Sequence, residues 1–254
     1  MRTICVLVLL VGVRPLLPNA LQGSDPTWLQ TTARLEKAAL DGTTKELRAI
    51  RADLVRRVAA PAADGPLLRY TLAYTSYRMV NLPDVPDNER TELLNDAVAQ
   101  LQQVVKGNPK DAEAHALLGS VYGLQIAQSP IVRGMTLGPR ASGALDRAAE
   151  IEGGNPRVVL LQGVAAFNTP AMFGGGTDKA AQLLRRSLER FMAEPADKAW
   201  PNWGRFDAHV WLGQALLDRG DKAGARAEYD KARSLAPNSG WLRYVLLPAL
   251  DGKK

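Results

Sequence analysis

A glycine-rich segment is the strongest candidate for ligand chemistry in this sequence. Three glycines stand directly before a predicted helix, in the order Gly174, Gly175, Gly176, Thr177. Glycines let consecutive backbone N–H groups turn toward one point, and a helix N-terminus adds partial positive charge. The segment therefore predicts a site for a carboxylate or a phosphate. The alternative is that the glycines only let the chain turn tightly, and Asp178 supports it because its carboxylate can occupy the same N–H groups.

Signatures of catalysis and of metal binding are missing. The glycine-rich segment lacks the Gly-Lys-Ser/Thr order of a phosphate loop, and neither Gly-x-Ser-x-Gly nor His-Glu-x-x-His occurs. A single cysteine excludes a cysteine-based zinc site, and two histidines, His115 and His209, argue against a histidine-rich metal centre. The acidic run at Asp84 and Asp87 does not have calcium-loop spacing, which favours a hydrated loop. We expect no enzyme activity, no cofactor and no metal.

The composition is that of a folded globular protein with no nucleic-acid partner. Apolar residues make up 46% of the 254 residues and charged residues 23%, which excludes a disordered chain. The net charge is +6, but the lysines and arginines are interleaved with acidic residues. Interleaved charges are typical of solvated helix faces and not of a nucleic-acid surface.

The first 23 residues have the pattern of a secretory signal peptide. Arg2 precedes an uncharged apolar run of ten residues from Ile4 to Val13, and Pro15 follows. A membrane-spanning helix needs about 20 residues, so this run is too short to cross a bilayer. The sequence therefore predicts a periplasmic or secreted protein without stable membrane insertion, cleaved between Leu21 and Asp25. The alternative is a buried N-terminal helix.

Helix signals fill the rest of the chain. Ser24 and Pro26 are a capping residue and a first-turn proline, and Asp41-Gly42 breaks the helix that they start. Short helices of this kind recur between glycines, prolines and asparagines, and no alternating strand pattern occurs. The sequence predicts an all-α protein in which residues 24–66 form an N-terminal helical hairpin.

The clearest internal repeat begins at Phe206. Its apolar and small residues stand at positions 7, 8, 11, 20, 24, 27 and 32 of the unit: Leu212, Gly213, Leu216, Ala225, Tyr229, Ala232 and Pro237. This spacing resembles the tetratricopeptide repeat (TPR), a helix-turn-helix unit of 34 residues. Weaker copies give about four units over residues 67–239, and residues 240–254 form a capping helix and tail. The resemblance implies a right-handed α-solenoid of helix-turn-helix pairs with capping helices.

The resemblance also implies a concave groove that holds an extended peptide. Its lining would come from the first helix of each unit, and the residues expected to hold the peptide are Leu160, Val164, Phe167, Asn168, Val210, Gln214 and Leu217. Position 4 of the unit holds His115 and His209, which we expect to pack against the second helix. The alternative for the concave face is that it packs on a neighbouring helix or on loops of the same chain.

Three turns inside the repeats are longer than the resemblance predicts, at residues 81–90, 129–140 and 168–177. Such turns project from one edge of a solenoid, so we expect a contiguous rim. Arg133 and Arg140 would reach the glycine-rich segment there and complete an anion site. The alternative is mere length variation, which costs little stability. Trp200, Trp203 and Trp241 are expected to cap the C-terminal end, with sugar stacking as the alternative.

Two classes of function follow from these features. The repeats and the exported N-terminus favour a non-catalytic scaffold that binds a protein partner or a peptide. An apolar groove beside a glycine-rich rim favours a small-molecule-binding accessory protein of a solute uptake system, with a small anionic ligand.

Overall fold

A computed structural model describes residues 26–60, 65–195 and 197–252, and the predicted signal peptide lies outside them. The described residues form helices without a strand, as the sequence predicts. The helices are α1 (Pro26–Asp41), α2 (Thr44–Ala59), α3 (Pro66–Met79), α4 (Asp87–Gly107), α5 (Ala112–Gln128), α6 (Pro130–Glu152), α7 (Pro156–Asn168), η2 (Ala171–Phe173), α8 (Thr177–Met192), α9 (Arg205–Asp218), α10 (Lys222–Leu235), η3 (Leu242–Leu246) and α11 (Leu247–Leu250).

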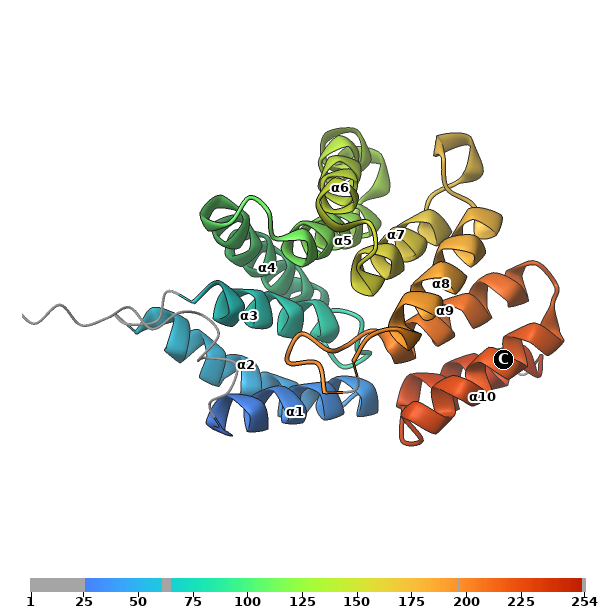
Figure 1. The fold of residues 1–254 in the computed structure, drawn as a ribbon, viewed down its shortest axis with the longest axis horizontal. Helices are drawn as coiled ribbons and strands as arrows, with labels where there is room; N and C mark the ends of the chain where they lie inside the picture. The colour runs from blue at the N-terminus through green and yellow to red at the C-terminus, as the bar shows by residue number, and fades with distance from the viewer. Residues whose placement is uncertain (1–25, 61–64, 196, 253–254) are drawn as a thin grey trace, which may run out of the picture.

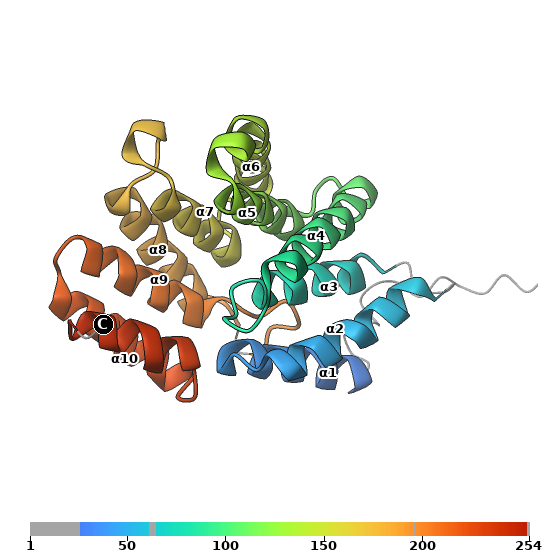
Figure 2. The ribbon, with the colours of Figure 1, turned by 180° about the vertical axis from the view of Figure 1, so that it is seen from behind.

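The helices pack as consecutive hairpins that stack into a solenoid (Figure 1). In each hairpin an odd-numbered helix contacts the next helix, from α1 with α2 through to α9 with α10. The odd-numbered helices also contact one another in series, α1 with α3, α3 with α5, α5 with α7, and α7 with α9. They therefore line the inner side of the solenoid, which curves until α1 approaches the C-terminal end of α10 (Figures 1 and 2).

Glycines set the distance between the two helices of three hairpins. A Cβ atom added at these glycines would lie 2.3–2.8 Å from a side chain of the second helix, closer than real Cβ atoms approach. The contacts are Gly119 against Leu145, Gly163 against Leu184, and Gly213 against Tyr229. Each glycine stands at position 8 of a predicted unit, counted from Ala112, Pro156 and Phe206, so the repeat spacing located these close contacts.

The predicted enlarged turn at residues 129–140 is wrong. Ser129 alone connects α5 to α6, and residues 130–140 are the first turns of α6, with Pro139 inside the helix. Pro130 occupies the first helical turn, where proline is favoured. Leu137 and Ala141 pack on the core, and this packing overrides the poor helix propensity of Gly134, Gly138 and Pro139.

Of the other two predicted enlarged turns, the one at residues 81–90 is shorter than predicted, and the one at residues 168–177 is present as predicted. In the segment 81–90, α4 already begins at Asp87, and the Arg90 side chain donates to the carbonyl oxygens of Val80, Leu82 and Val85. The segment 168–177 is a true insertion, which contains the short helix η2 between α7 and α8. Its tip projects from the same edge of the solenoid as α6 (Figure 1).

Candidate functional site

The connection between α8 and α9 fills part of the concave side. This α8–α9 connection, residues 193–195 and 197–204, lies against α3, which is far away in the sequence (Figure 1). The indole Nε1–H of Trp200 donates to Thr71 Oγ1 over 2.9 Å, and that of Trp203 donates to the Tyr70 hydroxyl over 3.1 Å. Tyr74 stacks on Trp203 with 4.7 Å between the ring centroids.

These contacts correct the expected role of the tryptophans. Trp200 and Trp203 are buried on α3 in the middle of the solenoid, so they do not cap its C-terminal end. Leu242, Leu246 and Leu250 of η3 and α11 supply the buried apolar residues at that end.

A buried arginine anchors the start of the connection. Arg157 of α7 is 0% exposed, and its guanidinium donates to both carboxylate oxygens of Glu194 over 2.7 and 2.9 Å. Its Nη1 also lies 3.6 Å from Oε1 of Glu113 on α5. Burial raises the pKa of the Glu113 carboxyl, although Arg157 favours the charged form. The ion pairs therefore tie the connection to α5 and α7.

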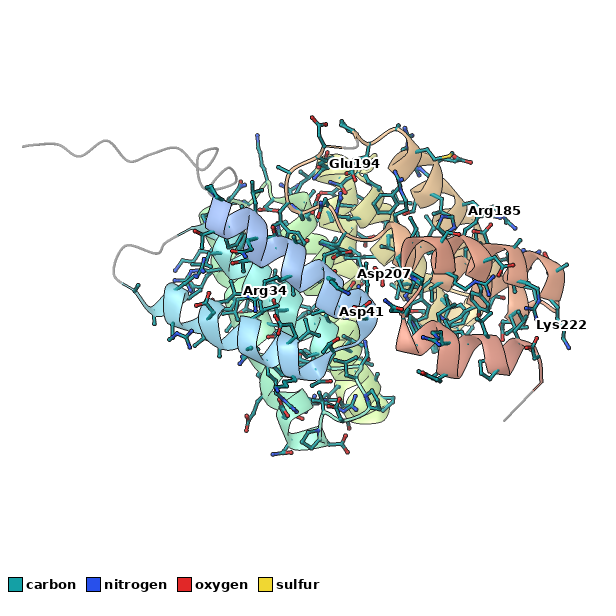
Figure 3. All side chains as sticks on the ribbon, turned by 90° about the horizontal axis from the view of Figure 1, so that it is seen from below. Arg34, Asp41, Arg185, Glu194, Asp207 and Lys222 are labelled. Carbon is teal, nitrogen blue, oxygen red and sulfur yellow. The ribbon has the colours of Figure 1, made fainter. Side chains whose placement is uncertain are left out.

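A second ion pair joins the two halves of the solenoid. Arg78 of α3 donates to both carboxylate oxygens of Asp207 on α9, each over 3.0 Å, and to the Ala39 carbonyl oxygen of α1 over 3.1 Å. Asp207 lies at the centre of the molecule, between α1 and the C-terminal hairpin (Figure 3). The neighbouring Glu36 accepts a long hydrogen bond of 3.4 Å from the Tyr74 hydroxyl.

The electrostatics of Glu36 differ from those of an ordinary surface carboxylate. Burial raises its pKa to about 7; Arg78 opposes this shift and the charge of Asp207 adds to it. The guanidinium of Arg78 is already shared between Asp207 and a backbone carbonyl. Glu36 therefore lacks a dedicated cation.

The predicted peptide groove is divided by the connection. Leu160 and Val210 are buried core residues, which contradicts their predicted place in an open groove. Leu160 lies under the connection. A Cβ atom added at Gly204 would lie only 3.0 Å from the Cδ2 atom of Leu160. The remaining predicted residues are only partly covered or exposed: Val164, Phe167, Asn168, Gln214 and Leu217. These residues belong to the C-terminal halves of α7 and α9.

An aromatic stripe crosses this uncovered part. Trp211 makes edge-to-face contacts with two other rings. The ring centroids of Phe167 and Trp211 are 5.5 Å apart, and those of Trp211 and Trp241 are 5.8 Å apart. Four residues after Phe167 the chain enters η2, where Met172 is 83% exposed and Phe173 is 72% exposed. We call Met172 and Phe173 the η2 tip. Neither feature was predicted from the sequence, although large apolar residues in a glycine- and proline-rich turn were a usable signal.

The glycine-rich segment does not present its N–H groups to a ligand. They donate to carbonyl oxygens of the turn and of the end of α7: Gly174 to Ala171, Gly175 to Pro170, and Gly176 to Ala166 and Thr169, over 2.8–3.2 Å. The Gly174 carbonyl oxygen in turn accepts a hydrogen bond from Lys179 over 2.7 Å. Thr177 starts α8, and Asp178 pairs with Arg219 and not with the backbone. In this conformation the glycines shape the turn, which was the alternative interpretation.

The two predicted rim arginines lie on α6 and not in a loop. Arg133 donates to the Gln128 side chain over 2.9 Å and to the Gln125 carbonyl oxygen over 3.3 Å. Arg140 is exposed. Within the described part of the chain, no hydrogen bond connects either arginine to the glycine-rich segment.

The histidines have local structural partners. His209 Nδ1 lies 2.6 Å from Glu228 Oε2 of α10, as expected for a residue packed on the second helix. His115 Nε2 lies 3.2 Å from the Pro109 carbonyl oxygen, next to the start of its own helix and not on the second helix. Among residues 26–60, 65–195 and 197–252, no three potential metal ligands gather. Within the same residues, no helix has the length and apolarity needed to span a bilayer.

Comparison with known proteins decides the nature of the last hairpin. Residues 206–239 match the tetratricopeptide repeat. A thermophilic TPR protein from Thermus thermophilus has a similar structure, with a TM-score of 0.60 and 20% identity over 87% of this chain and 98% of that one. The described part of the chain is thus an all-α, TPR-like solenoid, and solenoids of stacked repeats commonly present extended binding surfaces.

A second solved structure is more similar in sequence. It is the HusA haemophore from Porphyromonas gingivalis, with 26% identity and a TM-score of 0.53, and the match covers 75% of this chain and 94% of that chain. No curated protein sequence matches this one.

Proposed function

We propose that the protein is an exported, non-catalytic binding protein for a flat, apolar small molecule that bears carboxylates, such as haem. The observation that carries this proposal is the partly exposed aromatic stripe together with the exposed η2 tip, which follows α7 in the chain. Large apolar side chains that stay exposed together mark binding surfaces. The predicted signal peptide supports export, because uptake of an external solute needs a carrier outside the cytoplasm.

The concave side supports a compact ligand better than an extended peptide. A peptide laid along the inner helices would have to displace Trp200 and Trp203, which are buried and hydrogen-bonded to α3. The predicted groove residues that remain uncovered lie in the C-terminal halves of α7 and α9.

The similarity to a haemophore supports haem as the ligand to test. Methionine is among the side chains that ligate haem iron in proteins, and Met172 is almost fully exposed. Arginine pairs well with carboxylates, and Arg140 is exposed on α6, which stands at the same edge of the solenoid as the η2 tip (Figure 2). The anionic ligand expected from the sequence is therefore retained, with Arg140 and not the glycine N–H groups as its partner.

A protein partner is the second candidate. The TPR-like fold favours it, because repeats of this type commonly bind other proteins. The same exposed residues would form the contact. A partner that co-purifies in stoichiometric amount and is lost in the η2-tip variant, while haem does not bind, would favour this candidate.

Haem titration tests the first candidate. We expect saturable one-to-one binding of haemin, measured by the change in Soret absorbance, and at least tenfold weaker binding for Met172→Ser/Phe173→Ser. Neither tip residue is buried, so the double variant should fold normally.

The matched control is Met192→Ser. Met192 is 76% exposed at the other end of α8, about 22 Å from the η2 side at 1.5 Å per residue. This variant should bind haemin like the unchanged protein. Equal haemin affinity in the tip variant and the control would exclude the η2 tip as the site.

A further inference from the structure

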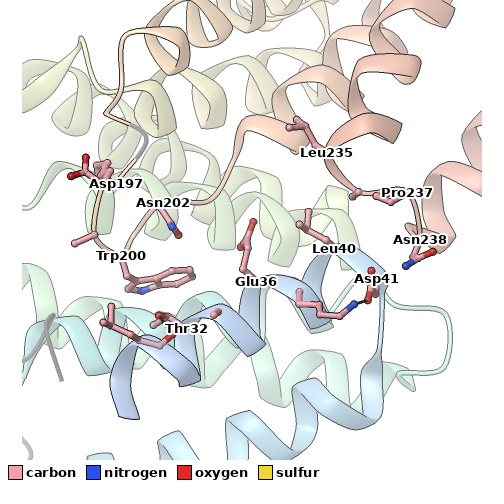
Figure 4. Close-up of a pocket in the computed structure, with 16 residues that line it drawn as sticks. Thr32, Glu36, Leu40, Asp41, Asp197, Trp200, Asn202, Leu235, Pro237 and Asn238 are labelled. Carbon is pink, nitrogen blue, oxygen red and sulfur yellow. Dashed lines mark hydrogen bonds and ion pairs between the residues drawn. The ribbon is translucent and has the colours of Figure 1, made fainter. Parts of the chain in front are cut away.

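A cleft separates the two ends of the solenoid, away from the aromatic stripe and the η2 tip. It has a volume of about 710 Å³ and is bounded by α1, by residues 197–200 and 202 of the α8–α9 connection, and by the turn after α10 (Figure 4). A cleft of this size is in the range of small-molecule sites. Since its walls come from both ends of the chain, it exists only in the closed solenoid.

Half of the residues that line the cleft are apolar, and the other half are polar or charged. The apolar lining comes from all three elements and includes Leu29, Ala33, Leu40, Trp200, Leu235 and Pro237. Leu29 and Leu235 remain 46% and 44% exposed, although each is a large apolar side chain. An apolar ligand part would cover them.

One carboxyl group points into the middle of this cleft. Glu36 stands between Trp200 and Leu40, with its carboxylate directed toward the open space (Figure 4). The hydrogen bond that it accepts from Tyr74 is long, 3.4 Å. The cost of burying a carboxylate without a cation falls sharply when a ligand supplies the cation.

The other charged groups around Glu36 are engaged elsewhere. On α1, Lys37 pairs with Asp41. On α3 and α9, Arg78 pairs with Asp207. On the connection, Lys198 donates to the Pro201 carbonyl oxygen over 2.6 Å, and Asp197 is exposed. Arg157 on α7 is paired with Glu194. Because the neighbouring cations already have partners, Glu36 is the group best placed to pair with the cation of a ligand.

We infer that this cleft binds a small organic cation, an apolar amine whose ammonium group pairs with Glu36 and whose apolar part lies against Trp200 and the leucines. The class of ligand follows from a carboxyl group without a cation of its own, placed in a cleft that also offers apolar walls. A neutral ligand would leave Glu36 without a cation, and an anion would be repelled by the ionised Glu36 carboxylate.

Three probes with one skeleton test the charge preference by calorimetric titration of the full mature chain. They are 3-phenylpropylamine, 3-phenyl-1-propanol and 3-phenylpropionate, which carry charges of about +1, 0 and −1 at neutral pH. We expect the amine to bind at least tenfold more tightly than the alcohol, and the carboxylate to bind most weakly. Binding of the alcohol or the carboxylate as tight as that of the amine would overturn the inference, as would no binding of the amine.

The pH dependence gives a second readout. With the pKa of Glu36 at about 7, the ionised fraction rises about 30-fold between pH 5.5 and pH 8. The probe amine stays protonated throughout, so its affinity should rise by roughly that factor, and binding below pH 7 should release a proton. A flat pH profile would contradict the pairing with Glu36.

Two variants and a control complete the test. Glu36→Gln should abolish both the preference for the amine and its pH dependence. Leu235→Lys places a competing ammonium group in the wall of the cleft and should abolish amine binding; Leu235 is exposed, so this variant should fold. Val55→Lys, on the exposed face of α2, is the matched control and should bind normally. Amine binding that persists in both cleft variants would place the amine elsewhere.

Discussion

Glu194→Ala is expected to lower the free energy of unfolding by about 3–5 kcal/mol, the usual cost of leaving one member of a buried ion pair without its partner. Arg157 is 0% exposed, and Glu194 accepts both of its donated hydrogen bonds at 2.7 and 2.9 Å. Glu113, at 3.6 Å, is too far to replace them fully. The change also frees the start of the α8–α9 connection.

Chemical denaturation followed by circular dichroism measures this loss. The control is Glu150→Ala, which removes an exposed pair with Arg147 and should change stability by less than about 1 kcal/mol. In the Glu194→Ala background, Arg157→Met should restore part of the loss because it removes the unpaired charge. A loss below about 1 kcal/mol for Glu194→Ala would show that Arg157 is not buried as described.

Gly213→Leu should destabilise the protein by about 3 kcal/mol, the upper end of the usual range for overpacking. A Cβ atom at this position would lie 2.3 Å from Cε1 of Tyr229, which is fully buried, so both helices of the hairpin would have to move apart. The loss would appear as a lower denaturation midpoint with an unchanged slope.

Gly123→Ala is the matched control for this substitution. Gly123 lies inside α5, and a Cβ atom there would meet nothing within 4 Å. Alanine should therefore raise stability by about 0.5–1 kcal/mol, since glycine is a poor helix former. A neutral result for Gly213→Leu would mean that α9 and α10 do not pack in the register described here.

The helical hairpins were predictable because their signals are local and periodic. Gly213, Tyr229 and Ala232 stand at offsets that place them between two helices, and they are buried as the repeat requires. The segment 129–140 was misinterpreted for a related reason. Its glycines and Pro139 are local helix breakers, whereas the packing of Leu137 and Ala141 that stabilises α6 is a tertiary effect.

The closure of the concave side was not predictable from repeat spacing. The hydrogen bonds from Trp200 to Thr71 and from Trp203 to Tyr70 span 129 and 133 residues, and they follow no period. Two tryptophans within four residues were the available signal, and their position before the last repeat favoured a cap. The glycine-rich segment was misinterpreted for a different reason. Its sequence indicates backbone N–H groups that could bind an anion, but it does not show which carbonyl oxygens of the same chain accept hydrogen bonds from them.

Indole hydrogen exchange, followed by NMR, tests most directly whether the α8–α9 connection closes the concave side. The Nε1–H groups of Trp200 and Trp203 are buried and hydrogen-bonded, whereas Trp241 is 37% exposed. Opening the connection would require breaking the Arg157–Glu194 pair, so both buried indoles should exchange only on large-scale unfolding. We predict that the Trp200 and Trp203 signals persist long after that of Trp241 has exchanged. Exchange of all three at similar rates would contradict a closed concave side and would restore the inner groove as the binding surface.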